Sequence, residues 1–319
     1  MEPNVMAEQH GNTSVPGLRN TDQPPGPTSL SLSWSEEDIE NRIGLFKAGR
    51  YTSPNKLLGF VAAVLLTGVF FAVVVYLYSA FASNPLVERF SLAFIRTKNL
   101  STTIPAVLLF FWAMSLLYIK GQKTHFQARA LDLAALPQQP DFVLNESSAK
   151  VVLERIHSLV DHPRHFLLLN RIERALSNLH NIGGISEVST ILKDQAENDE
   201  NQVASSYMLV NGMVWSVPVL GFIGTVQGLG SGIAAFGKTL EVSGGDLDKI
   251  KQGLLGVTNG LATGFETTLV ALVCALFIQL YIHYLQQKEM EFMDQCNDYC
   301  QSYVLSKLRL GGRRQSEAS

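Results

Sequence analysis

Long stretches without a charged residue constrain this chain more than any other feature of its sequence. Residues 201–237, between Glu200 and Lys238, contain no Asp, Glu, Lys or Arg over 37 positions. A helix crosses a bilayer with roughly 20 apolar residues, so this run is long enough to do so. Charged residues make up only 17% of the chain, and its mean hydropathy is +0.13. We therefore expect an all-α integral membrane protein.

Four stretches of the sequence are long and apolar enough to span a bilayer. The sequence between Lys56 and Glu88 carries no charge, and neither does the sequence between Lys98 and Lys120. The last stretch is interrupted only by Glu266. The predicted transmembrane helices are residues 56–82, 101–119, 206–237 and 254–285.

Lysine and arginine counts orient these spans. Nine basic residues lie in segment 120–205, whereas the loops 83–101 and 238–256 carry three each. Four more basic residues occur in segment 42–56, and five lie from Lys288 to the end of the sequence. This bias predicts that both termini and segment 120–205 are cytoplasmic and that the chain is a multi-pass protein.

The segments outside the spans are predicted from composition and periodicity. Residues 1–50 hold Asn, Pro, Gly and Ser without an apolar signal segment, which predicts a disordered cytoplasmic tail. In segment 120–205 apolar residues recur at spacings of three and four, which predicts a helical cytoplasmic domain. We expect the last helix of this domain, from Glu187, to continue directly into the third span. Residues 286–319 are predicted to form a cytoplasmic C-terminal helix and tail.

Small residues follow one face of the third span and one face of the fourth. In the third span they are Gly221, Gly224, Thr225, Gly228 and Gly232, preceded by Pro218; in the fourth they are Gly260, Gly264, Thr268, Ala271 and Ala275. Glycine lets helix backbones approach closely in lipid, so both stripes predict helix packing. The two threonines on these faces are expected to meet near the middle of the membrane. A neutral hydroxyl pair can hold a water molecule or bind a carboxylic acid without trapping a proton. The alternative is an ordinary contact between small residues.

Glu266 is the acidic exception in the fourth span. Such a residue costs roughly 3 kcal/mol inside a membrane helix unless it is paired or protonated, and it tends to face a water path. We therefore interpret it either as a proton relay or as a residue that bonds to Thr263 or Thr267 or faces a neighbouring subunit. Because Glu266 lies two residues from Thr268, the two side chains point to nearly opposite sides of the helix.

Patterns typical of enzymes and metal sites do not stand out. The sequence has no phosphate-binding loop, nucleophile elbow or HExxH pair. Its cysteines, Cys274, Cys296 and Cys300, do not form a disulfide framework and have no second Cys/His pair at zinc-ligand spacing. Basic residues are scattered among acidic ones, and the net charge is −3, which argues against nucleic-acid binding. We expect no enzymatic activity, no metal and no cofactor.

Two blocks resemble a known family. The sequence VPVLGFIGTVQGL, residues 217–229, is similar to the pore-helix signature of the MotA/TolQ/ExbB proton-channel family, Pro-x-x-Gly-x-x-Gly-Thr-x-x-Gly. The sequence GLATGFETTLVALVCAL, residues 260–276, resembles the second block of the family, and Thr268 falls on its hydroxyl position. TolQ and ExbB usually have three spans and an external N-terminus. The chain therefore looks like a divergent four-span member.

The resemblance implies a homopentamer around a central pore in the bacterial inner membrane. The pore would enclose two single-span partner helices of the MotB/ExbD/TolR type, whose membrane aspartate binds the proton. The chain would then be a proton-conducting, stator-like subunit that converts ion flow into mechanical work or energised envelope transport. Its expected proton path consists of Thr225, Thr268, Glu266, Thr263 and Thr267.

The sequence leaves several alternatives open. The driven process is outer-membrane import, envelope maintenance, motility or defence, and the ion is a proton or sodium. A stand-alone multispan channel or transporter is a rival interpretation. Another is a membrane scaffold that recruits partners through its cytoplasmic helices.

Overall fold

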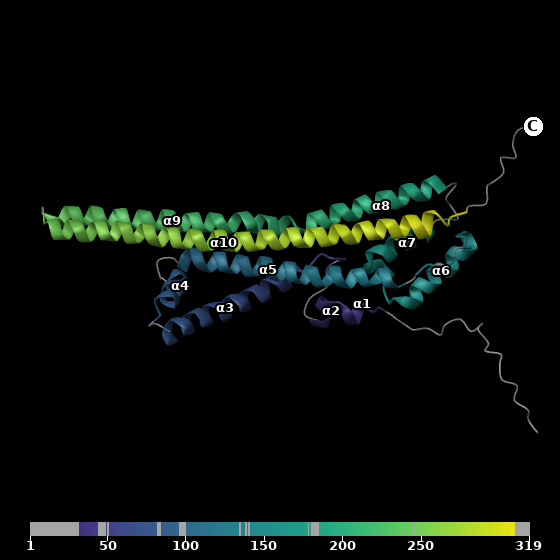
Figure 1. Cartoon of the computed structure of the whole chain (residues 1–319), viewed down its shortest axis with the longest axis horizontal. Helices are drawn as coiled ribbons and strands as arrows, with labels where there is room; N and C mark the ends of the chain where they lie inside the picture. Colours follow the sequence, from purple (N-terminus) through teal and green to yellow (C-terminus); the bar gives the residue numbers. More distant parts are fainter. Residues whose placement is uncertain are drawn as a thin grey trace, which may run out of the picture. The chain divides into compact units, whose positions relative to one another are not determined.

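The computed structural model describes residues 32–43, 49, 51–81, 84–95, 100–133, 135–137, 139, 141–177, 179, 185–244 and 246–309. These residues are mostly helical, and the β-type pairing among them is limited to two isolated bridges. The long helices are α3 (Lys56–Ala80), α5 (Leu100–Ala128), α8 (Ile185–Ser206), α9 (Met208–Ser243) and α10 (Leu247–Tyr299) (Figure 1). The shorter helices are α1 (Trp34–Glu37), α2 (Ile39–Ile43), α4 (Pro85–Ile95), α6 (Glu146–Leu159) and α7 (Leu167–Ser177), and a π-helical turn, Cys300–Leu305, follows α10.

Four helical stretches are long and apolar enough to cross a membrane, so the chain is a multi-pass membrane protein. They are Lys56–Ala80, Leu100–Asp132, Ile185–Glu241 and Leu247–Leu305. Each predicted span falls on one of these stretches, and the predicted all-α fold is confirmed. Three of the helices run well beyond the predicted spans. A charged residue marks where a helix leaves lipid, whereas the helix itself ends only where its backbone conformation changes.

Helix α3 is apolar on every side, as expected of a helix that faces lipid. Leu65 is 66% exposed and Val69 is 61% exposed, which would be unfavourable in water but not in a bilayer. The remaining side packs closely on α5. A Cβ atom at Gly59 would lie 2.5 Å from Cδ2 of Leu116, so a larger residue at this position would displace the Leu116 side chain.

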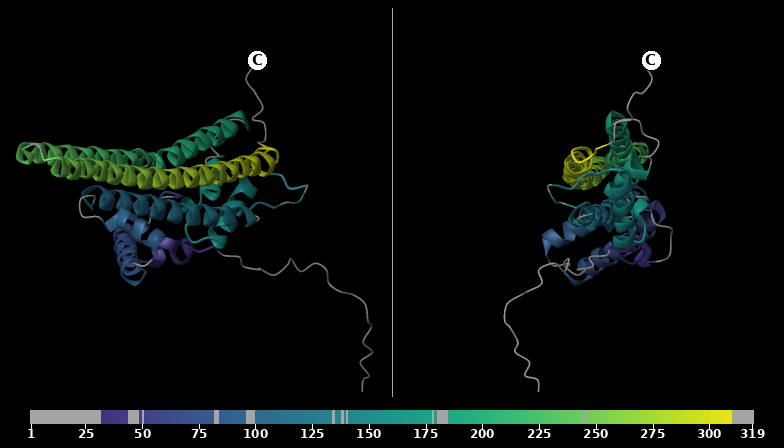
Figure 2. Two further views of the ribbon diagram at one scale, coloured as in Figure 1. Left: turned by 60° about the vertical axis from the view of Figure 1, so that its left-hand side comes forward. Right: turned by 90° about the vertical axis from the view of Figure 1, so that its right-hand side faces the viewer.

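Helices α9 and α10 form an antiparallel hairpin and lie side by side in both views (Figures 1 and 2). The chain turns at Gly244, whose φ of +53° is in the left-handed region that glycine adopts without strain. Asp246 then accepts a hydrogen bond of 3.0 Å from the N–H of Asp248 and caps the first turn of α10. A short, capped turn therefore joins the two longest helices among the described residues.

Helices α8 and α9 follow one another without a loop, as the sequence predicts. Between them Tyr207 keeps a right-handed helical conformation, with φ −85° and ψ −12°. Its N–H bonds to the carbonyl of Ala204, three residues back instead of four. This tighter turn changes the direction of the helix, so that α8 leaves the line of α9 (Figure 1).

Helices α6, α7 and α8 share an apolar core with the last turns of α10. Val152 and Ile156, which belong to the predicted periodic pattern, are 2% and 0% exposed. Phe292 and Cys296 of α10 lie in the same core. The domain predicted for residues 120–205 therefore extends to the C-terminal part of α10. We refer to this end of the long helices as the domain end and to the end at the α9–α10 turn as the hairpin end.

Residues 32–43 fold against this domain. Trp34 is 3% exposed, and its ring stacks on that of His165 with 4.9 Å between centroids. Asp161 accepts hydrogen bonds from the first backbone N–H groups of α1, which a helix start leaves without internal partners. The disorder predicted for residues 1–50 is therefore wrong for this segment, because a carboxylate distant in the sequence supplies its helix cap. The rest of that prediction, on residues 1–31, 44–48 and 50, lies outside the described residues.

Candidate functional site

Glycine residues form the contact between α9 and α10. A Cβ atom at Gly228 would lie 2.7 Å from the carbonyl oxygen of Gly260, and one at Gly264 would lie 2.8 Å from the Cα of Thr225. Both distances are too short for real Cβ atoms, so the two backbones touch directly. We call this surface the glycine contact; its members are Gly221, Gly224, Gly228, Gly232, Gly260 and Gly264. Pro218 lies inside α9, one turn before this contact begins.

Thr225 and Thr268 meet across the glycine contact, and we call them the threonine pair. Their hydroxyl oxygens are 2.5 Å apart. The Thr268 hydroxyl donates to the carbonyl of Gly221 at 2.9 Å, and the Thr225 hydroxyl lies 2.9 Å from the carbonyl of Gly264. Each hydroxyl has one hydrogen and two lone pairs. Since neighbouring oxygens accept both hydrogens, each half-buried hydroxyl keeps a lone pair for a further donor.

Thr263, Thr267 and Glu266 occupy different positions around α10. Thr263 and Thr267 are buried, and their hydroxyls donate to the carbonyls of Asn259 and Gly264 at 2.7 and 2.8 Å. Glu266 is half-buried and points away from the side of α10 that carries Thr268. The structure therefore brings Thr267 to the glycine contact and leaves Glu266 on another face.

The threonine pair lies near one end of α5. The hydroxyl oxygen of Thr102, in the first turn of α5, is 3.1 Å from the position of a Cβ on Gly224. From Thr225 helix α9 continues for 18 residues to Ser243, about 27 Å at 1.5 Å per residue. The hairpin thus projects beyond the start of α5 (Figure 1). The pair is therefore level with the first turn of α5. Its expected position near the middle of the membrane stays a prediction.

A buried group of charged and polar side chains joins three helices at the domain end. Lys120 of α5 and Glu289 of α10 form an ion pair of 2.8 Å, with side chains 2% and 1% exposed. Tyr207 donates to one oxygen of Glu289 at 2.6 Å, and Thr124 donates to the other at 3.1 Å. Lys120 also donates to the hydroxyl of Ser206 at 2.7 Å. We call these five residues the Lys120 network. Both carboxylate oxygens have donors, which offsets the cost of burying the charge.

A second buried lysine fixes the N-terminal segment to α5. Lys123 lies 2.6 Å from a carboxylate oxygen of Glu40 and 3.7 Å from one of Asp38, and all three side chains are 1% exposed. Burial raises the pKa of the Asp38 carboxyl, against the lowering effect of Lys123. Sequence reasoning missed both lysine clusters. Lys120 served there only to mark the end of the second span, and Lys123 only as one of the basic residues counted in segment 120–205. The acidic residues that bind them are distant in the sequence.

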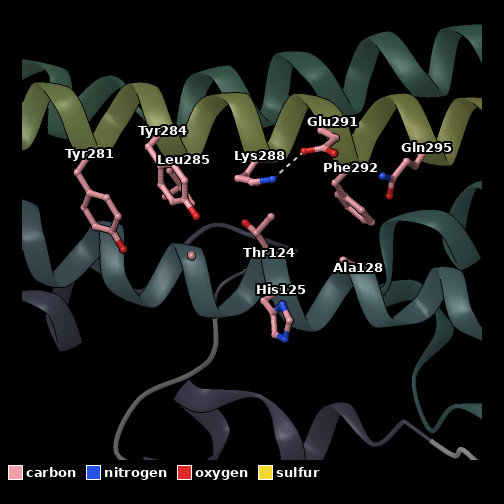
Figure 3. Close-up of a pocket in the computed structure, with 11 residues that line it drawn as sticks. Thr124, His125, Ala128, Tyr281, Tyr284, Leu285, Lys288, Glu291, Phe292 and Gln295 are labelled. Carbon is pink, nitrogen blue, oxygen red and sulfur yellow. Dashed lines mark hydrogen bonds and ion pairs between the residues drawn. The ribbon is translucent and has the colours of Figure 1, made fainter.

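A surface cavity opens between α5 and α10 at the domain end (Figure 3). Thr124 and His125 line it from α5, and Tyr284 and Lys288 line it from α10. Lys288 pairs with Glu291 at 3.0 Å, and both side chains are more than half exposed. No residue of the glycine contact lines this cavity. It is therefore separate from the threonine pair. Among the described residues no group of three or more His, Cys, Asp or Glu side chains is arranged to hold a metal ion.

Comparison with known proteins gives one match. Residues 167–298 match the family model described as the MotA/TolQ/ExbB proton channel family. The matched segment contains the threonine pair, the whole glycine contact and Glu289, whereas Lys120 and Thr102 lie outside it. No curated protein and no solved structure matches the chain.

Proposed function

Because residues 167–298 make this chain a member of the MotA/TolQ/ExbB proton channel family, we propose that it is a proton-conducting, stator-like subunit of a motor in the bacterial inner membrane. In this proposal five copies surround two single-span helices of a MotB/ExbD/TolR-type partner. Both termini and the α6–α8 domain are cytoplasmic. Proton flow along the partner helices turns one component against the other, and the chain has no enzymatic role.

The observation that carries the proposal is the threonine pair within a contact formed mainly by glycine backbones. A protonated aspartic acid on the partner is neutral and can donate its O–H to a free lone pair of Thr225 or Thr268. The hydroxyl pair carries no charge, so it binds the acid without holding the proton as a carboxylate would. The site thus favours brief binding and release of a neutral acid.

The charge pattern of α10 favours a partner over a complete path in this chain. Between Lys251 and Lys288 the only Asp, Glu, Lys or Arg is Glu266, and Glu266 lies on a different face from the threonine pair. A proton relay contained in this chain alone would use a series of titratable side chains along its path. Here the proton-binding carboxylate comes from the partner.

The Lys120 network supports the stator role. It connects α5, the junction of α8 with α9, and α10 at one level. Buried, fully hydrogen-bonded charges hold a defined geometry, because any displacement leaves a charge without a partner. The two helices of the glycine contact are therefore fixed to the domain that would bear the mechanical load.

The first test is the mass and stoichiometry of the detergent-purified complex, co-expressed with a candidate single-span protein that has an aspartate in its membrane helix. We expect five copies of this chain with two of the partner. A stable complex of another stoichiometry, unchanged by that protein, would overturn the motor proposal. It would favour a stand-alone channel or a scaffold.

The second test measures proton uptake by liposomes that contain the complex. We expect Thr225→Val and Thr268→Val each to lower uptake at least about tenfold, the effect of a loss of roughly 1.4 kcal/mol. Thr258→Val is the matched control, because Thr258 is exposed and donates only to the carbonyl of Leu254 in its own helix. Equal uptake by all three variants would contradict a role for the pair in conduction.

A further inference from the structure

A small cavity lies behind the glycine contact, where α5 meets α9 and α10. Its volume is about 10 Å³, close to the smallest space that holds one water molecule. Apolar side chains form much of its wall. The lining residues that carry a polar side-chain atom are Thr102 and Thr103 of α5 and Thr267 and Cys274 of α10.

Thr103 contributes a buried hydroxyl to this cavity. Its side chain is 5% exposed, and its oxygen has no hydrogen-bond partner in the described part of the chain. A buried hydroxyl without a partner is unfavourable in an apolar medium. Such a group calls for an explanation, and the commonest one is an ordered water molecule.

Thr267 supplies the complementary group. Its single hydrogen is donated to the carbonyl of Gly264 at 2.8 Å, so for any further partner the Thr267 oxygen acts as an acceptor. Thr103 has a hydrogen to donate, and Thr267 has a lone pair to offer. One water molecule accepts from the first and donates to the second, which satisfies both hydroxyls at once.

We propose that this cavity is a binding site for a single water molecule, which joins Thr103 of α5 to Thr267 of α10. The evidence for this site is the cavity itself and the hydrogen-bonding needs of Thr103 and Thr267. The site does not depend on the proposed proton conduction. Thr103 lies outside the segment that matches the family model, residues 167–298. The water molecule therefore links Thr103 of α5, which lies outside the matched segment, to Thr267, the residue next to Thr268.

The proposal is tested by the sign of a stability change in the full chain, purified in detergent. Valine has the shape of threonine without the hydroxyl. If a water is bound, Thr103→Val removes one of its few partners, and the melting temperature falls by about 2–4 °C. If the hydroxyl has no partner, valine relieves an unfavourable burial, and the melting temperature stays the same or rises.

Thr67 provides a matched reference. It lies in α3, its hydroxyl is also buried without a partner in the described residues, and it does not line this cavity. We expect Thr67→Val to leave the melting temperature unchanged or higher. Thr103→Ser should retain the melting temperature better than Thr103→Val, because serine keeps the donor. If Thr103→Val melts at or above the unchanged protein, as Thr67→Val does, the water site is ruled out.

A density map of the unchanged protein at a resolution that shows waters gives a second, independent test. Density for one water within hydrogen-bonding distance of Thr103 and Thr267 supports the site. An empty cavity in such a map overturns it, whatever the variants do.

Discussion

Helix α10 carries two polar residues, Thr268 and Glu289, 21 positions apart, whose side chains find hydrogen-bond partners in opposite ways. Thr268 is neutral and takes its partners from one neighbouring helix, namely a carbonyl and a hydroxyl of α9. Glu289 is charged, and its partners are Lys120 and Thr124 of α5 and Tyr207 at the start of α9. The comparison shows that polarity without charge suffices at the glycine contact, whereas a buried charge at the domain end needs donors from several elements.

The threonine pair and the Lys120 network also require different distances between the helix backbones. The threonine pair needs glycines, because only bare backbones approach closely enough for a hydroxyl to reach the carbonyl of the other helix. The Lys120 network needs long side chains, and it tolerates wider helix spacing. Variants of each should therefore fail for different reasons and by different amounts.

The largest effect should come from breaking the Lys120 network. Replacing Glu289 by Ala leaves the ammonium of Lys120 buried without its carboxylate, which costs about 3–5 kcal/mol. Glu291→Ala is the control, because Glu291 pairs with Lys288 at the surface, where a pair contributes about 0–1 kcal/mol. Thermal unfolding in detergent measures both variants.

A double variant sharpens this test. Lys120→Met combined with Glu289→Leu removes both charges, so it should recover much of the stability that Glu289→Ala loses. If Glu289→Ala and Glu291→Ala destabilise the protein equally, the buried charge is not the reason for the network's contribution.

The next effect concerns the glycine contact. At Gly228 an added Cβ would lie 2.7 Å from a backbone oxygen, whereas at Gly230 nothing lies within 4 Å. We expect Gly228→Ala to destabilise the hairpin by about 1–3 kcal/mol through overpacking. Gly230→Ala should be neutral or stabilising by up to about 1 kcal/mol, since alanine favours the helix. Similar unfolding temperatures for the two variants would show that the backbones do not touch in solution.

These two regions also differ in how far the sequence predicts them. The glycine contact and the meeting of Thr225 with Thr268 follow from a local period, because residues three and four apart share a helix face. The Lys120 network does not follow from a local period. Lys120 and Glu289 are 169 positions apart, and neither local sequence indicates that the two residues pair. The sequence also makes no prediction of the level of the threonine pair relative to α5. A span's place along a neighbouring helix depends on packing, which charge-free runs do not reveal.

The structure of the N-terminal segment, residues 32–43, is only partly predictable from its sequence. Ser33 followed three residues later by Glu36 is a local signal for a helix start. That signal was available, but the hydroxyl of Ser33 in fact bonds to Asp161, 128 positions away. The sequence thus contained the helix start, while its docking depends on a distant carboxylate.

A smaller effect should come from the threonine pair itself. A double-mutant cycle with Thr225→Val, Thr268→Val and the combined variant isolates the coupling between the two hydroxyls. Hydrogen bonds between membrane helices contribute about 0.6 kcal/mol on average, so we expect a coupling of about that size. A coupling as large as the loss in Glu289→Ala would break the comparison, because neutral and charged contacts would then stabilise the protein equally.

The smallest effect should come from Asp161, a carboxylate that has many donors but remains exposed. Partial burial opposes the shift, yet hydrogen bonds from the backbone and hydroxyl of Ser35, the N–H of Trp34 and the hydroxyl of Ser33 hold its pKa at about 2. A depressed pKa means that the contribution to docking is complete above the usual value near 3.8 and is lost as pH falls through about 2.

Fluorescence of Trp34, with Trp112 and Trp215 replaced by Phe, measures this docking between pH 5 and pH 2. We expect a modest change below pH 4, with the protein otherwise folded, because the side chain is exposed and solvent screens its interactions. Asp161→Asn should remove the pH dependence in this window. Complete unfolding over the same window would mean that an exposed carboxylate contributes as much as the buried Glu289, and that burial does not set the strength of these contacts.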